Sequence, residues 1–241
     1  MIQLSREDFV ELGLSIPTRP LIGWVTGQLA AVQGREKRLE GRGVTASFLT
    51  EVKTLVGAVA RLQIALEDSE ESLPPEVARA QRIREEAFTY WQEAQQILKV
   101  EFGAFPEIQV QGRLGVRTGR LLATLCREME CAVAMLRLHS TQLSWLAAND
   151  AFLRSGDGLI GELKEAKAGL DSARRLLSPV LLEQCCEKGK LYDLTRKLVR
   201  IGRLAFLHEP EQAAAFNYTL LREELRAHPA VRTRTPKAIA R

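Results

Sequence analysis

Histidine and aromatic residues are scarce in this chain. Of 241 residues, three are histidine, and phenylalanine, tryptophan and tyrosine together make up 6%. The histidines, His139, His208 and His228, lie far apart in sequence. The chain also lacks the Glu-x-x-His pairs that hold iron in helical bundles. We therefore predict no metal centre, no cofactor and no base for a nucleophile, so the chain is not expected to be an enzyme.

Cysteines and long apolar runs are also few. Of the four cysteines, Cys126 and Cys131 would lie about 140° apart around a helix axis, and Cys185 and Cys186 are adjacent. Neither pair predicts a disulfide. No apolar run approaches the ~18 residues of a membrane span, and the acidic N-terminal residues do not fit a signal peptide. We expect a cytoplasmic protein that makes no membrane contact.

The chain is rich in an apolar repeat with steps of three and four residues. Its clearest copies lie at 48–66 and 122–146. Such spacing is typical of helices that pack lengthwise, as in coiled coils, and strand-like alternation is almost absent. We predict an all-α fold, a bundle of long antiparallel helices with a smaller C-terminal helical layer. The expected helices cover residues 5–16, 20–39, 45–69, 75–102, 113–150, 163–177, 191–205 and 213–225.

These helices predict four consecutive parts. They are an N-terminal docking helix at 1–16, a long-helix bundle at 17–150, a smaller helical layer at 151–225 and a basic flexible tail at 226–241. Within the bundle, helices 45–69 and 75–102 are expected to form an antiparallel hairpin, because the loop between them is short. The helix at 113–150 would be about 57 Å long at 1.5 Å per residue, with His139 at a core position.

Positive charge is concentrated at the C-terminal end. The formal net charge is +4, and residues 225–241 contain five basic residues and no acidic one. The rest of the chain is therefore close to neutral. A segment this basic, with few large apolar residues, packs poorly against a core, which is why we predict that the tail is flexible.

A first candidate anion site is the cluster Arg113, Arg117 and Arg120 at the start of the predicted helix 113–150. Positive side chains oppose the helix dipole at that end, and a bound anion would resolve the conflict, because backbone N–H groups and guanidinium groups would converge on it. The alternative is that these arginines pair with acidic residues on other helices. The sequence has no phosphate-loop signature that decides between the two.

A second candidate site is a basic helix face. Arg196, Lys197, Arg200 and Arg203 share one side of the predicted helix 191–205, and Arg232 and Arg234 of the tail follow. Together they could contact nucleic-acid phosphates. A solvated surface is the alternative. No aromatic residues are interleaved for base stacking, which single-strand binders usually require.

The function that fits these patterns is a non-catalytic helical scaffold or interaction subunit, which binds a protein partner or forms a homo-oligomer. The alternative is a helical accessory subunit of a nucleoprotein complex, which contacts phosphates through the basic face and tail. A third possibility is a small-molecule binder or enzyme that uses the space between helices, because bundles can host such pockets without a sequence motif.

Overall fold

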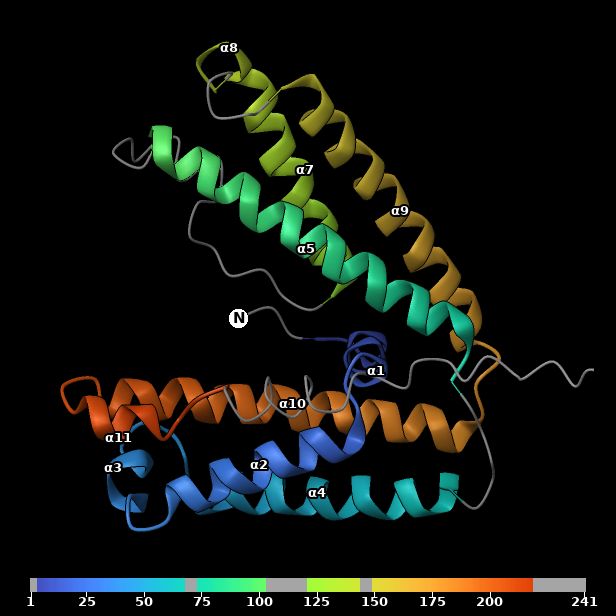
Figure 1. The fold of residues 1–241 in the computed structure, drawn as a ribbon. Helices are drawn as coiled ribbons and strands as arrows, with labels where there is room; N and C mark the ends of the chain where they lie inside the picture. The colour runs from blue at the N-terminus through green and yellow to red at the C-terminus, as the bar shows by residue number, and fades with distance from the viewer. Residues whose placement is uncertain (1–3, 68–72, 103–120, 144–148, 219–241) are drawn as a thin grey trace, which may run out of the picture. The chain divides into compact units, whose positions relative to one another are not determined.

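The fold is all-α, as predicted, in the part of the chain that the structure describes. The structure is a computed structural model, and it describes residues 4–67, 73–102, 121–143 and 149–218 (Figure 1). All regular elements in these ranges are helices. They form two compact units, one made of residues 1–71 and 178–241 and the other of residues 72–177. Within the described ranges, no helix has the length and apolar character needed to cross a membrane.

The first unit is built around α10 (Pro179–Ala205). Ser178 starts this helix, because its hydroxyl accepts a hydrogen bond from the backbone N–H of Leu181 at 3.2 Å. Residues Leu191, Leu198 and Val199 of α10 are fully buried. The helices that pack on α10 are α1 (Arg6–Leu14), α2 (Thr18–Val32), α3 (Glu36–Glu40), α4 (Ala46–Glu67) and α11 (Pro210–Ala214) (Figure 1).

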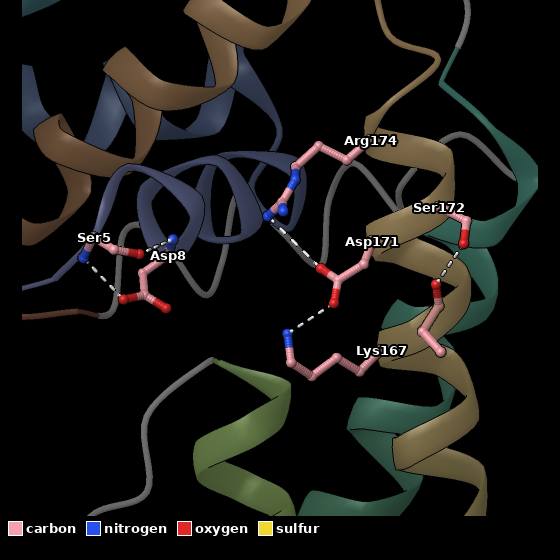
Figure 2. Close-up of polar contacts among 7 residues, drawn as sticks. Ser5, Asp8, Lys167, Asp171, Ser172 and Arg174 are labelled. Carbon is pink, nitrogen blue, oxygen red and sulfur yellow. Dashed lines mark hydrogen bonds and ion pairs between the residues drawn. The ribbon is translucent and has the colours of Figure 1, made fainter.

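Helix α1 begins with a reciprocal cap and crosses α10 at two glycines. The Ser5 hydroxyl accepts from the Asp8 N–H at 3.1 Å, and the Ser5 N–H donates to the Asp8 carboxylate at 2.9 Å (Figure 2). Further along, a Cβ added at Gly13 would overlap the carbonyl oxygen of Cys185. A Cβ added at Gly189 would in turn overlap the carbonyl of Phe9. The two backbones thus approach as closely as glycine allows.

The second unit is a bundle of three long helices, α5 (Pro75–Phe102), α7 (Leu122–Leu138) and α9 (Asp150–Arg174), with the short α8 (Ser140–Leu143). The seam predicted on α5 is confirmed, because Ala80, Ala87 and Ala94 are all buried. Small residues also let α9 approach, since a Cβ at Gly156 would collide with the hydroxyl of Tyr90. That hydroxyl donates to the carbonyl of Phe152 at 3.1 Å.

The surface of the second unit carries ion pairs within and between helices. On α9, Asp171 lies between Lys167 and Arg174, at 3.2 and 3.7 Å (Figure 2). The Arg137 guanidinium of α7 pairs with Asp157 of α9 at 2.7 Å. These side chains are between 25% and 57% exposed to solvent, so each pair is expected to contribute less than about 1 kcal/mol to stability.

The prediction of one continuous helix at 113–150 is wrong beyond Leu138, and its first positions, 113–120, lie outside the described residues. α7 ends at Leu138, with His139 as its C-cap, and α9 starts at a new cap, where the Asn149 side chain accepts from the Phe152 N–H at 3.0 Å. His139 is half-buried and bonds to the Gln142 side chain at 3.0 Å. A polar stretch follows His139, and polar side chains that bond locally favour helix ends, although the apolar spacing continues past them.

Two further helices are longer than predicted. α9 starts at Asp150 and runs through Gly156 and Gly158, where the sequence predicted no helix. α10 starts at Pro179 instead of position 191. Glycine lowers helix propensity by roughly 1 kcal/mol, but packing of a buried face outweighs that cost. The last predicted helix, 213–225, is wrong at its start, because α11 ends at Ala214 and positions 215–218 are not helical; positions 219–225 lie outside the described residues.

The two units also differ from the consecutive parts expected from the sequence. The range 17–150 contributes to both units, because the first unit ends at residue 71 and the second begins at residue 72. The part predicted at 151–225 is also divided, because the chain returns to the first unit at residue 178. α4 packs against α10, and α5 packs against α7 and α9. The helices expected to form a hairpin therefore belong to different units.

Candidate functional site

The second half of α10 holds the four basic residues of the candidate helix face. At 100° per residue, Arg196, Arg200 and Arg203 lie within about 60° of one another around the axis, and Lys197 lies next to Arg200. Arg200 and Arg203 are exposed, and Arg196 and Lys197 are half-buried. The structure therefore brings together the four residues of this site that it describes.

These basic residues differ in what they contact. Lys197 forms an ion pair with Asp193 at 2.9 Å, which neutralises it. The guanidinium carbon of Arg196 lies 5.5 Å from the ring centre of Tyr192. Arg203 donates through Nε to the carbonyl of Phe216 at 2.6 Å and lies 5.5 Å from the ring of Tyr218. Ring and carbonyl contacts hold a guanidinium in place but leave its positive charge.

Two exposed leucines lie close to these arginines in the chain. Leu204 follows Arg200 by one helical turn and is 54% exposed, and Leu207, just beyond the end of α10, is 65% exposed. We call the set Arg196, Arg200, Arg203, Leu204 and Leu207 the Arg/Leu face. Neither leucine was predicted to belong to the site, because a leucine at helical spacing is normally assigned to the core.

An aromatic cluster of Trp24, Tyr192 and Tyr218 underlies the Arg/Leu face. Trp24 of α2 is fully buried, and its indole N–H donates to the carbonyl of Asn217 at 2.9 Å. Its ring centre lies 5.8 Å from that of Tyr192 and 5.6 Å from that of Tyr218. Such contacts fix ring orientation. Arg196 and Arg203, which lie against these two tyrosine rings, are therefore supported by side chains of fixed orientation.

A hollow adjoins the Arg/Leu face at the end of α10. It has a volume of about 340 Å³, and its walls include Arg35, Lys37 and Arg38 from α3 and the preceding turn, together with Phe206. Arg38 lies over the Phe206 ring, 4.7 Å from its centre, and forms an ion pair with Glu209. Phe206 is the chain neighbour of Leu207, so the hollow lies close to the C-terminal end of the face.

Arg113, Arg117, Arg120, Arg232 and Arg234 lie outside the described residues. Among the residues that are described, no group of three or more His, Cys, Asp or Glu side chains could hold a metal ion. The predicted absence of a metal and of a cofactor stays a prediction for the chain as a whole.

One titratable group is deeply buried under α1. Lys188 of α10 is 5% exposed. Burial lowers the pKa of its amine below the ordinary 10.5, because the ammonium form loses its hydration, and the nearby Cys185 thiol acts weakly in the opposite direction. A neutral amine is a potential nucleophile. Here, however, the backbone of Phe9 lies directly against the next residue, Gly189, so α1 covers this part of α10.

We expect Lys188→Met to raise the free energy of unfolding by about 1–3 kcal/mol at neutral pH, because burial of this amine is unfavourable. The folded-state pKa is lowered, so the wild-type penalty is complete below that pKa and disappears as the pH rises towards 10.5, the value in the unfolded chain. Urea unfolding at pH 7 and pH 10 should therefore show a smaller gain at pH 10.

Lys190→Met is the matched control on the same helix. Lys190 is far less buried and bonds to Glu187 at 2.7 Å. Its removal should change stability by less than about 1 kcal/mol, and in the destabilising direction. Equal effects of the two substitutions would contradict the interpretation of Lys188.

Comparisons with models of protein families, with curated proteins and with solved structures give no match to this chain. Its function must therefore be inferred from the residues and their arrangement.

Proposed function

We propose that this protein is a non-catalytic helical interaction subunit of the cytoplasm, which binds a protein partner or a second copy of itself through the first unit. The observation that carries the proposal is the Arg/Leu face. Two leucines that are more than half exposed lie on it beside three arginines. Arginine is enriched in protein interfaces, and exposed apolar side chains beside it supply area that is buried on binding.

The aromatic cluster that underlies the Arg/Leu face reduces the side-chain conformational entropy that is lost on binding. Arg196 and Arg203 are held against the rings of Tyr192 and Tyr218, and those rings pack on the buried Trp24. Immobilising a free side chain at an interface costs about 0.5–1.5 kcal/mol. Side chains that are already held in position lose less of this freedom when a partner binds.

The alternative function, contact with nucleic-acid phosphates, is supported by the three arginines that keep their charge. The ring beside Arg196 does not strengthen it. Tyr192 is only 5% exposed, so its ring is not available to stack on a base. Phosphate contact also gives no role to Leu204 or Leu207. A protein partner accounts for both the arginines and the leucines.

The test is the mass and composition of the particle isolated gently from its native host, by light scattering with absorbance at 260 and 280 nm. We expect the wild-type particle to be heavier than the 26.9 kDa of one chain and to keep this mass after nuclease treatment. The double variant Leu204→Glu with Leu207→Glu should no longer associate and should have the mass of one chain. Ile64→Glu is the control, since Ile64 of α4 in the same unit is 62% exposed and lies outside the Arg/Leu face.

Two results would overturn the proposal. One is a particle of a single chain with no companion at concentrations near those in the cell. The other is excess absorbance at 260 nm that nuclease removes together with the extra mass, which would establish the nucleoprotein alternative. In that case the log–log dependence of affinity on salt should have a slope of about −4 for four or five neutralised phosphates.

A further inference from the structure

We propose that the occupant of the Arg/Leu face is an amphipathic helix of a partner protein, with leucine-like side chains flanked by acidic ones, lying along the second half of α10. This inference rests on the proposed function and specifies the class of partner. It follows from the charge of the face, from the kind of element that forms it and from the hollow at its end.

The charge of the face is complementary to an acidic partner. Among the described residues, neither Arg196, Arg200 nor Arg203 forms an ion pair, whereas Lys197 is neutralised by Asp193. A guanidinium has five N–H donors, and Arg203 uses its Nε for the Phe216 carbonyl. The remaining donors match carboxylates, which they can bind in a bidentate manner.

The face belongs to a helix, and this favours a helix as its partner. The backbone groups of α10 bond within the helix, so it offers no free edge to which an extended peptide could add as a strand. Binding must therefore use side chains alone. A second helix satisfies its own backbone and presents side chains at three- and four-residue spacing. Arg196 and Leu204 are eight residues apart, or about 12 Å along the axis, which equals roughly two turns of such a partner.

The hollow near Leu207 could accept a further side chain of the partner helix. Arg35, Lys37 and Arg38 contribute positive charge to its wall, which exceeds the one negative charge of Glu36, and the Phe206 ring contributes an apolar surface. Arg38 is already paired with Glu209 of this chain. Because Arg38 already pairs with a carboxylate of this chain, an acidic side chain at the end of a partner helix could be bound near the hollow by the same chemistry.

The test uses the full chain and three synthetic probes. The first is an 18-residue helical peptide with leucine at every third or fourth position and glutamate beside each leucine. The second is its twin with lysine in place of glutamate, and the third is a 30-nucleotide single strand of DNA. Fluorescence anisotropy measures the affinity of each for the wild type and for Arg200→Glu, Leu204→Glu and the control Ile64→Glu.

We expect the acidic peptide to bind the wild type and Ile64→Glu equally, and to bind Arg200→Glu and Leu204→Glu at least tenfold more weakly. The lysine twin should bind Arg200→Glu better than it binds the wild type, because the charge pattern is reversed on both sides. The inference is overturned if the lysine twin and the acidic peptide bind the wild type equally. It is also overturned if Leu204→Glu has no effect and the DNA competes, which indicates a polyanion site.

The outcomes separate this inference from the proposed function. If the acidic peptide fails to bind, but the Leu204→Glu and Leu207→Glu pair still dissociates the native particle, the partner class is wrong and the interaction subunit remains. If the native particle is a single chain and the peptide also fails to bind, both proposals are wrong. Circular dichroism of each variant checks that the helices are retained.

Discussion

Replacing Gly189 by alanine is expected to displace α1 from α10 and to lower the free energy of unfolding by about 3 kcal/mol or more. The added methyl group would overlap the backbone carbonyl of Phe9. Overpacked cores cost typically about 1–3 kcal/mol when side chains can adjust. A carbonyl in the middle of a helix cannot rotate away, so the helices must separate. Urea unfolding measures the loss, and hydrogen exchange of the α1 amides shows where it occurs.

The control for Gly189→Ala is Gly57→Ala on α4 of the same unit. A Cβ at Gly57 meets nothing within 4 Å. Alanine is more favourable than glycine inside a helix by roughly 0.5–1 kcal/mol, so this variant should be slightly more stable than the wild type. The close crossing of α1 and α10 would be refuted if Gly189→Ala were also stabilising, with unchanged protection of α1.

Replacing Trp24 by alanine is expected to cost about 3–5 kcal/mol, as for other large buried aromatic side chains. Trp24 has no exposed surface and lies between the rings of Tyr192 and Tyr218. Its loss leaves a cavity between α2 and α10 and removes the support beneath the Arg/Leu face. Thermal or urea unfolding gives the cost.

Trp24→Phe distinguishes the contribution of ring packing from that of the indole hydrogen bond. This variant keeps an aromatic side chain but loses the N–H that donates to Asn217 at 2.9 Å. Trp24→Phe should lower the free energy of unfolding by less than half as much as Trp24→Ala, because a single hydrogen bond contributes about 1 kcal/mol. If phenylalanine and alanine were equally harmful, the hydrogen bond rather than ring packing would dominate at this site.

The apolar repeat was sufficient to predict the fold class and much of the core. On α4, Val52, Leu55 and Val59 are buried at the predicted spacing. On α5, the alanine seam is buried as predicted, together with Ile83 and Tyr90. These predictions succeed because each depends on spacing within one helix, which the sequence states directly.

The errors occurred where neighbours in space decide the outcome. Gly156 predicts a break in isolation, but its lack of a side chain is what lets α9 approach Tyr90. The short loop between α4 and α5 predicted a hairpin, yet each packs on helices from a distant part of the chain. Local sequence gives no information about which distant segment covers a helix.

The candidate site was predicted in part for the same reason. Arg196, Lys197, Arg200 and Arg203 could be placed on one face from their spacing. The exposure of Leu204 and Leu207 could not, because it depends on which side of α10 the other helices leave uncovered. The contact between Arg196 and Tyr192 could be predicted from the sequence, since Tyr192 precedes Arg196 by four residues. The contact of Arg203 with Tyr218 was not, because those residues meet only after the chain turns back.

The division of the chain into units has a consequence for its synthesis. The first unit needs both ends of the chain, residues 1–71 and 178–241, whereas the second needs only residues 72–177. At roughly 5–20 residues per second, α10 is completed about 7–28 s after α4 leaves the ribosome. Until then, the apolar stripes of α1, α2 and α4 have no partner on α10. The middle unit is therefore expected to fold first, which replaces a flexible loop of roughly a hundred residues by a compact body before the two ends of the chain meet.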